Sequence, residues 1–317
     1  MKLRPVLNHS LPAILVGLLL IGVFACGCTG TPEQKPVPTT VVPGQTTAPV
    51  TPVSATPGPA TLPYQVSQIP GTIMVSGSTT VLPIAQAAAE AYMDRNLVAD
   101  IQVAGGGSSV GVQAVGEKTS EIGMSSRDLK AEEKTKYPAL MQHTVAKDCI
   151  VVIVHPENPV SVMTLDQVRG IYNGSIQSWE KVGGTASSFV VIGRDSASGT
   201  REYFTEHVMQ KEKYRSDMRE MNSNGAIATY VAGNRYAIGY VGLGYVSSDV
   251  KGIKIMSRGT AVEPSVAMVL SGSYPISRSL YMLTSGAPSG LTKDYLDFLM
   301  STEGQLIVTR EGFVPLV

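Results

Sequence analysis

From about residue 70 to the C-terminus, short runs of β-branched residues alternate with amphipathic stretches of helical periodicity. The clearest pairs of such runs are residues 72–76 with 84–93, 100–104 with 110–118, and 189–193 with 201–209. This alternation is typical of proteins in which mostly parallel strands are covered by helices. The chain of 317 residues is also long enough for two domains. We therefore expect an α/β fold.

Four of the predicted strands end in glycine and hydroxyl residues that open the next helix. The junctions are residues 76–80 (Ser-Gly-Ser-Thr-Thr), 105–109 (Gly-Gly-Gly-Ser-Ser), 124–127 (Met-Ser-Ser-Arg, before a short helix that contains Leu129) and 194–200 (Arg-Asp-Ser-Ala-Ser-Gly-Thr). A helix N-terminus has unpaired N–H groups and a partial positive charge, and glycine lets a ligand approach the backbone. Any single junction has a structural alternative, because Ser and Thr are ordinary helix caps. Four together predict an anion-binding site, which does not require a basic protein.

The charge balance is compatible with such a site and favours no polyanionic partner. The formal net charge is zero, and the part of the chain after residue 69 carries about −2. Nothing in this balance indicates nucleic acid as a partner.

The N-terminus has the pattern of a secretory signal. Lys2 and Arg4 precede an apolar run over residues 11–24, which is short for a spanning helix of about 20 residues. The first charge after the run is Glu33, which leaves an uncleaved anchor as an alternative. The run ends in Ala-Cys-Gly-Cys-Thr-Gly over residues 25–30, which resembles a lipobox and is most similar to those of archaeal lipoproteins. We expect a signal peptide over 1–28 and lipidation at Cys28, or alternatively at Cys26, on an exported, membrane-anchored protein.

Residues 29–69 have the composition of a linker. Nine prolines and nine threonines lie between residues 29 and 68, and only Glu33 and Lys35 are charged. Such a segment buries too little apolar surface to fold and favours extended polyproline II. The remaining cysteine, Cys149, lies in an apolar run over residues 149–154, so we expect it to be buried without a disulfide partner.

The four junctions resemble the anion loops of a known family, the phosphate-binding subunit of the phosphate ABC importer. Residues 76–83, 106–111 and 122–127 are similar to its first three loops, and 194–201 to its Arg…Ser-Gly-Thr loop, which is the most specific of the set. The resemblance implies a two-lobe type II periplasmic-binding-protein fold with the ligand cleft between the lobes. It also implies capture of inorganic phosphate outside the cell for delivery to ABC transporter permease subunits, without a cofactor.

The resemblance places phosphate contacts in all four loops. The implied residues are Ser78, Thr79, Thr80, Ser108, Ser109, Ser126, Arg127, Arg194, Ser198, Gly199 and Thr200. Ser126 departs from the family pattern, in which an aspartate accepts the proton of bound phosphate, so discrimination against sulfate, arsenate or molybdate stays open. Asp128 and Asp195 are candidate substitute acceptors, and residues 222–225 are a candidate fifth loop.

The same fold implies that the chain crosses twice between the lobes. We expect one crossing near residues 147–155 and the return near 254–268. Lobe 1 then comprises residues 70–150 and 259–317, and lobe 2 comprises residues 151–258. We expect a monomer whose lobes close on the anion.

Enzyme signatures are weak. Residues 111–119 nearly spell a P-loop, but Glu117 separates glycine from lysine and the apolar spacing fits a helix interior. Residues 178–181 fit Ser-x-x-Lys without the companion motifs of penicillin-binding enzymes. His143, His155 and His207 have no metal-ligand spacing. We therefore expect a binding protein that is not an enzyme and holds no metal; a surface phosphatase or a tethered adhesion protein is the alternative.

Overall fold

The computed structural model describes residues 64–316. Helices and strands alternate along the chain, and the runs that the sequence predicted as strand–helix pairs are confirmed as β1–α1, β2–α2 and β6–α5. The strands are β1 (Gly71–Gly77), β2 (Ala99–Gly105), β3 (Ile122–Ser125), β4 (Leu140–Val154), β5 (Val162–Thr164), β6 (Val190–Arg194), β7 (Arg219–Met221), β8 (Ala237–Gly242), β9 (Lys251–Gly252), β10 (Lys254–Ser257), β11 (Thr260–Val262) and β12 (Ser277–Ser285). The helices are α1 (Leu82–Met93), α2 (Ser108–Gly116), α3 (Ala131–Lys136), α4 (Leu165–Asn173), α5 (Gly199–His207), α6 (Asn224–Ala232), α7 (Val266–Leu270), α8 (Gly290–Met300) and α9 (Thr302–Arg310), with the 3₁₀ turns η1 (Trp179–Val182) and η2 (Leu243–Tyr245).

One hydrogen-bonded path of strands runs through both lobes. Its order is β2-β1-β3-β12-β4-β8-β6-β7, and β9 pairs with β4. The strands that precede the junctions are parallel, since β1 pairs in parallel with β2 and β3, and β6 with β7 and β8. The carboxyl ends of parallel strands meet at one edge of a sheet, which is where α/β proteins bind ligands.

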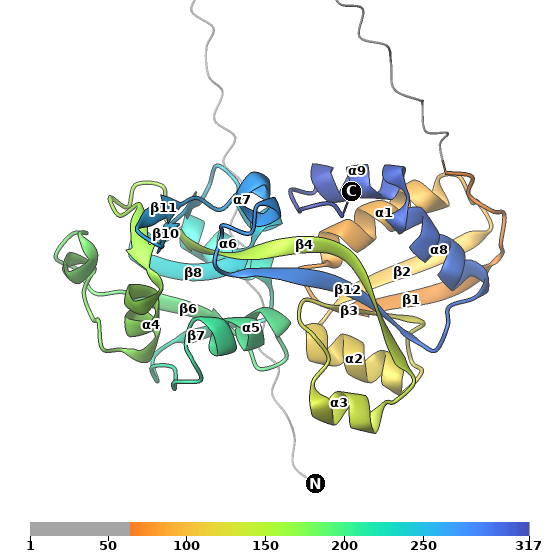
Figure 1. The fold of residues 1–317 in the computed structure, drawn as a ribbon, viewed down its shortest axis with the longest axis horizontal. Coiled ribbons are helices and arrows are strands. Elements are labelled where there is room, and N and C mark those ends of the chain that lie inside the picture. The colour runs from red at the N-terminus through yellow and green to blue at the C-terminus, as the bar shows by residue number, and fades with distance from the viewer. Residues whose placement is uncertain (1–63, 317) are drawn as a thin grey trace, which may run out of the picture. The chain divides into compact units, whose positions relative to one another are not determined.

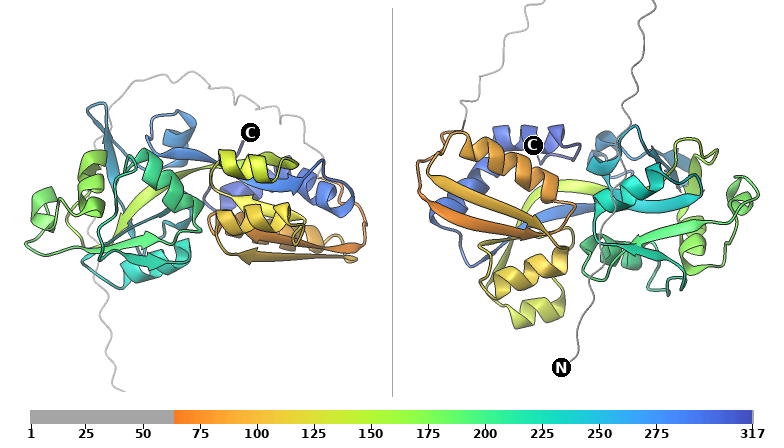
Figure 2. Two further views of the ribbon diagram at one scale, coloured as in Figure 1. Left: turned by 90° about the horizontal axis from the view of Figure 1, so that it is seen from below. Right: turned by 180° about the vertical axis from the view of Figure 1, so that it is seen from behind.

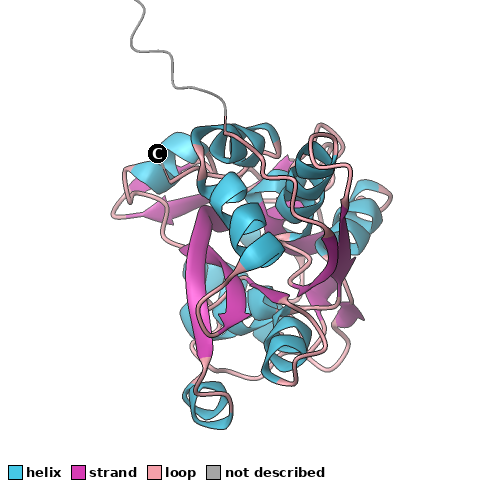
Figure 3. Cartoon of the chain, turned by 90° about the vertical axis from the view of Figure 1, so that its right-hand side faces the viewer, coloured by secondary structure: helices cyan, strands magenta, loops and turns pink. Residues whose placement is uncertain are grey.

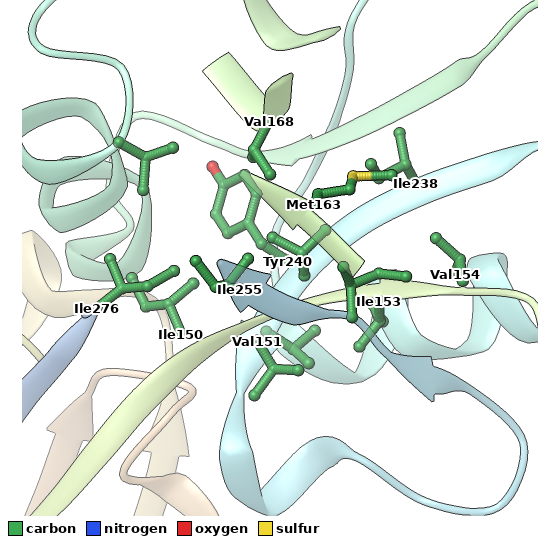
Figure 4. Packing of buried hydrophobic residues seen from close by; sticks show 14 of the residues in the cluster. Ile150, Val151, Ile153, Val154, Met163, Val168, Ile238, Tyr240, Ile255 and Ile276 are labelled. Carbon is green, nitrogen blue, oxygen red and sulfur yellow. The ribbon is translucent and has the colours of Figure 1, made fainter. Parts of the chain in front are cut away.

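Two separate hydrophobic clusters define two lobes within residues 64–316 (Figure 1). Lobe 1 comprises about residues 64–147 and 278–316, and lobe 2 about residues 148–277. In lobe 1, α1, α8 and α9 lie on one side of the strands and α2 and α3 on the other (Figures 1 and 3). The core of lobe 2 is built on β4 and β8, with Tyr240 and Ile153 among its buried side chains (Figure 4).

Two neighbouring strands, β4 and β12, connect the lobes, as both views of Figure 2 show. The long strand β4 pairs with β12 through its first part and with β8 through residues 150–154. We expected the return crossing near residues 254–268 and the lobe boundary at 258, and both expectations are wrong. Val262, Val269 and Ile276 pack in the core of lobe 2, so lobe 2 extends to about residue 276 and the return is β12.

The linker expected over residues 29–69 ends earlier than its composition suggested. From Tyr64 onward the chain packs on lobe 1, where Asp294 accepts hydrogen bonds from the Tyr64 hydroxyl at 2.8 Å and from the Ser67 amide at 3.0 Å. The signal peptide, the cysteines 26 and 28 and the rest of the linker lie outside the described residues. Within residues 64–316, no helix combines the length and the apolar character needed to cross a membrane. Cys149 is buried in β4, as expected, and forms no disulfide within residues 64–316.

A candidate anion site between the lobes

The first junction presents three buried hydroxyl residues, Ser78, Thr79 and Thr80. Gly77 has a φ of +134°, and a Cβ there would lie 2.4 Å from the carbonyl oxygen of Met124, so only glycine permits the turn. The Ser78 hydroxyl accepts a hydrogen bond from the Thr80 amide at 3.2 Å. The Ser78 side chain therefore shapes the turn that holds the two threonines.

The second junction lets lobe 2 approach lobe 1 closely. Gly107, with a φ of +97°, precedes α2, and a Cβ there would lie 2.5 Å from the carbonyl oxygen of Ala197 in lobe 2. The amide of Ser109 donates to the same carbonyl at 3.1 Å. Ser108, the first residue of α2, is fully buried.

The fourth junction meets the other three from lobe 2. Ser198 caps α5 by accepting from the Arg201 amide at 3.2 Å, and no acceptor within residues 64–316 is recorded for the amides of Gly199 and Thr200. A Cβ at Gly199 would lie 2.2 Å from Oγ of Ser108 and 2.9 Å from Oγ of Ser126. The second and third junctions thus converge on the beginning of α5.

A second contact at the same place joins the first and fourth junctions directly. Oγ1 of Thr80 and Oγ1 of Thr200 are 3.0 Å apart, and both residues are fully buried. We call this meeting place of residues 78–80, 108, 126 and 198–200 the interlobe seam.

Arg194 carries a buried positive charge at the start of the fourth junction. It is 1 % exposed, and its guanidinium donates to the carbonyl oxygens of Met221 at 3.2 Å and Asn222 at 3.1 Å. No carboxylate forms an ion pair with it in the described part of the chain. Burial lowers the pKa of Arg194, with Asp195 opposing that effect, yet an arginine stays protonated in proteins. Its charge is therefore not compensated by an ion pair, which favours an anionic ligand.

Arg127 is arranged in a different way, which argues against its predicted role as a phosphate donor. Its Nη2 lies 2.7 Å from Oε1 of Glu133, and its Nε lies 2.7 Å from Oε2 of Glu202 on α5. Burial alone would lower the pKa of Arg127, but these carboxylates outweigh it and raise the pKa. Two partner carboxylates thus compensate the positive charge of Arg127.

The third junction also differs from the others in its backbone. Leu129 does not lie in a helix, and α3 begins only at Ala131, because Glu133 turns back to accept from the Lys130 amide at 2.9 Å. Ser126 still faces the seam: it is buried, its amide donates to Oγ of Ser108 at 3.0 Å, and the two hydroxyl oxygens are 3.3 Å apart.

Ser109 and the two candidate proton acceptors lie in different surroundings. Oγ of Ser109 accepts a hydrogen bond from Nη2 of Arg127 at 3.3 Å, which ties this side chain to Arg127. Asp128 is exposed and accepts from the Tyr281 hydroxyl at 2.7 Å. Oδ1 of Asp195, beside Arg194, is buried and accepts no hydrogen bond within the described residues.

Three buried residues complete the seam. Asn224, in the candidate fifth loop, donates to Oγ1 of both Thr79 and Thr80 at 3.1 Å. Arg278 donates to Thr80 at 3.3 Å and forms an ion pair with Asp148 at 2.7 Å. Neither Arg278 nor Asp148 was among the predicted site residues, although a lone carboxylate in β4, directly before the apolar run 149–154, was a readable signal.

The alternative motifs do not form a catalytic constellation. Residues 111–116 of the near-P-loop lie in α2, and His207 is exposed and stacks on Tyr203 with ring centroids 4.0 Å apart. Among residues 64–316, no group of three or more His, Cys, Asp or Glu side chains could hold a metal ion.

The two-lobed fold and the seam define a protein that binds a small anion between its lobes, as comparison with known proteins supports. A model of the PBP superfamily domain matches residues 47–303. The phosphate-binding protein PstS of Bacillus subtilis is 34% identical over 250 residues, which cover 78% of this chain and 81% of that protein.

Solved structures agree in fold. A Clostridium perfringens protein assigned as a phosphate ABC transporter substrate-binding protein, solved with bound phosphate, is 36% identical with a TM-score of 0.73, covering 78% of this chain and 100% of that one. An ABC-type phosphate transport receptor from Vibrio cholerae is 29% identical with a TM-score of 0.63, covering 76% and 99%. The chain therefore belongs to the PBP superfamily and, within it, to the PstS family of phosphate-binding proteins, with the expected type II periplasmic-binding-protein fold.

Proposed function

We propose that this chain captures inorganic phosphate outside the cytoplasmic membrane and delivers it to the permease of an ABC importer. The observation that carries the proposal is the seam itself. Hydroxyls from both lobes meet at the beginning of α5, where the amides of Gly199 and Thr200 lie. The same junction carries the Arg194 guanidinium, which pairs with no carboxylate in the described residues. The names of the PstS relatives support phosphate as the anion.

The number of donors is sufficient for tight binding. Hydrogen bonds to a charged group contribute roughly 1.5–3 kcal/mol each, and micromolar affinity needs about 8 kcal/mol. We assign the phosphate contacts to Thr79, Thr80, Ser108, Ser126, Arg194, Ser198, Gly199 and Thr200. Arg127 is left out because it is paired with two carboxylates, and the side chain of Ser109 because it accepts a hydrogen bond from Arg127.

Anion specificity is tested by a thermal-shift panel of phosphate, arsenate, sulfate, molybdate and tungstate at equal concentration. A ligand that binds only the folded state raises the unfolding midpoint. We expect phosphate and arsenate to raise it strongly and sulfate weakly. A larger shift with sulfate or molybdate than with phosphate would assign the protein to another tetrahedral oxyanion.

The protein acts by binding, without turnover of its ligand. Binding energy shared by both lobes favours their closed arrangement, in which β4 and β12 act as the hinge. Small-angle scattering with and without phosphate tests the closure, with compaction as the expected result. Hydrolysis of p-nitrophenyl phosphate that survives rigorous purification and is lost in the Arg194→Ala variant would instead indicate a phosphatase.

The N-terminal region tethers the binding domain to the outer face of the membrane. The lipobox-like sequence supports lipidation at Cys28, with Cys26 as the alternative, and the Pro/Thr-rich residues up to 63 serve as the stalk. Cys28→Ser is expected to release the protein from the membrane fraction into the medium, while Cys26→Ser leaves it attached. The opposite result would move the lipid to Cys26, and retention of the double variant would indicate an uncleaved anchor.

A further inference from the structure

Asn224 reaches the seam in a fixed orientation. Its Oδ1 accepts a hydrogen bond from the Gly242 amide at 3.2 Å, and a backbone amide can only donate. The other end of the side chain, Nδ2, is thereby directed at the two threonines of lobe 1, 3.1 Å from each Oγ1. Both hydrogens of Nδ2 are used, and Asn224 is fully buried.

Arg278 reaches the same hydroxyl from the crossing strand β12. Its Nε and Nη2 donate to Oδ2 of Asp148 at 3.0 and 2.7 Å, and Oδ1 of Asp148 accepts from the Leu243 amide at 2.8 Å. The second hydrogen of Nη2 is directed at Oγ1 of Thr80, 3.3 Å away. Because Asp148 neutralises it, Arg278 brings a directed N–H group to the seam without a net charge.

These contacts determine the direction in which the Thr80 proton points. A hydroxyl has two acceptor lone pairs and one proton, whereas an amide NH₂ and a guanidinium can only donate. Asn224 and Arg278 occupy both lone pairs of Thr80, so its proton can only be given away. Its recipient here is Oγ1 of Thr200 at 3.0 Å. Within residues 64–316, the Thr200 hydroxyl then has no acceptor for its own proton.

We infer that Asn224 and Arg278 are positioning residues that fix Thr80 as a donor to Thr200 and so leave the Thr200 proton free to be donated to the bound anion. The inference rests on the phosphate-binding function proposed above. In water a hydroxyl can donate or accept, and a threonine that presents its lone pair repels an oxyanion. Fixing the proton before the ligand arrives removes that cost, in the same way as preorganised donors do in other anion sites. It also means that this part of the seam favours an unprotonated ligand oxygen.

The decisive experiment reverses the direction of the Thr80 proton with an isosteric change. Asn224→Asp keeps an acceptor for the Gly242 amide but replaces the donor NH₂ with a carboxylate oxygen, which attracts the Thr80 proton. We expect calorimetry at pH 8 to show phosphate affinity reduced about 100-fold, the loss of two directed hydrogen bonds. As pH falls and the new carboxyl gains a proton, it becomes a donor again. The affinity ratio of variant to wild type should therefore recover toward one, a pH profile that a purely structural role does not produce.

A double-mutant cycle separates proton direction from simple charge repulsion. In the Thr79→Val/Thr80→Val background both hydroxyls that face Asn224 are absent, so adding Asn224→Asp should cost only about threefold more. If the full loss persists in that background, direct repulsion explains the effect, and if the affinity ratio does not change with pH, the loss is structural; either result contradicts the inference. Asn234→Asp makes the same charge change just beyond the other end of α6, where its Oδ1 accepts from the Tyr236 amide, and should leave phosphate affinity unchanged.

A second variant covers the case in which Asn224→Asp does not fold. Arg278→Lys keeps a cation beside Asp148 but loses the N–H group directed at Thr80, and we expect about tenfold weaker phosphate binding. That loss should vanish in the Thr80→Val background; an undiminished loss there contradicts the inference. A wild-type protein that binds no phosphate at all would instead refute the proposed function.

Discussion

The junctions that follow β6 and β3 each place a buried arginine beside hydroxyl groups. The two guanidinium groups differ in their partners, which are neutral carbonyls for Arg194 and carboxylates for Arg127. Arg194 donates to two backbone carbonyls and pairs with no carboxylate among the described residues. Arg127 is held between Glu133 and Glu202, and Lys130 also contacts Glu202 at 3.1 Å. A buried charge without a counterion favours a charged ligand, whereas a neutralised one favours fixed structure. We therefore assign Arg194 to the proposed binding site, whereas Arg127 ties lobe 1 to lobe 2.

The strongest test of this difference removes each arginine in turn. We expect Arg194→Ala to weaken phosphate binding about 100-fold or more, because it removes the main cationic partner of a dehydrated anion. Arg127→Ala should change affinity less than about tenfold but lower the unfolding midpoint, because Glu133 and Glu202 lose their buried partner. Calorimetry and thermal unfolding without phosphate measure the two effects. Equal losses of affinity in the two variants would show that both arginines bind the anion.

A smaller effect is expected from the ion pair that joins the lobes. Glu202 on α5 contacts Arg127 and Lys130 of lobe 1, so Glu202→Gln removes an attraction that exists only when the lobes meet. Partly exposed ion pairs contribute about 0.2–1 kcal/mol, so phosphate should dissociate up to about fivefold faster in stopped-flow experiments. The difference should shrink at high salt, which screens the pair. Glu206→Gln, one turn further along α5, is the matched control, and an equal acceleration there would refute a specific tie.

Sequence patterns predicted the parts of this molecule that depend on local structure. The strand–helix alternation and the glycine-rich junctions were visible because each is set by neighbouring residues, such as Gly77 beside Thr79 and Thr80. The role of Arg127 was not visible, since its partner Glu202 lies in the other lobe and no local pattern connects them. Asn224 was only a candidate and Arg278 was not predicted, because no local pattern shows that either side chain meets Thr80. The return crossing was expected near residues 254–268, where Val262 packs in lobe 2, and not at β12.

Acid should weaken the ion pair between Arg127 and Glu133 in a defined pH range. Burial would raise the pKa of Glu133, but hydrogen bonds from Arg127 and from the Lys130 amide outweigh it and lower the pKa. A carboxyl whose folded pKa is depressed stabilises the protein above its unfolded value of about 4.3 and loses that contribution as pH falls through the folded value. Glu133→Gln should therefore lower the unfolding midpoint near neutral pH and show a smaller further decrease than the wild type below about pH 4. Parallel curves for the two proteins across this range would contradict the assignment.

The smallest expected effect distinguishes the adjacent residues Ser108, which faces the seam, and Ser109, whose hydroxyl contacts Arg127. Ser108 begins α2 and faces Gly199 and Ser126, whereas the hydroxyl of Ser109 accepts from Arg127. Ser108→Ala should weaken phosphate binding about tenfold, the loss of one hydrogen bond to a charged ligand. Ser109→Ala should change it less than about threefold, because the Ser109 amide still donates to Ala197 and only a contact to Arg127 is lost. Calorimetry on the two variants measures both, and a reversed order would place Arg127 and Ser109 at the anion after all.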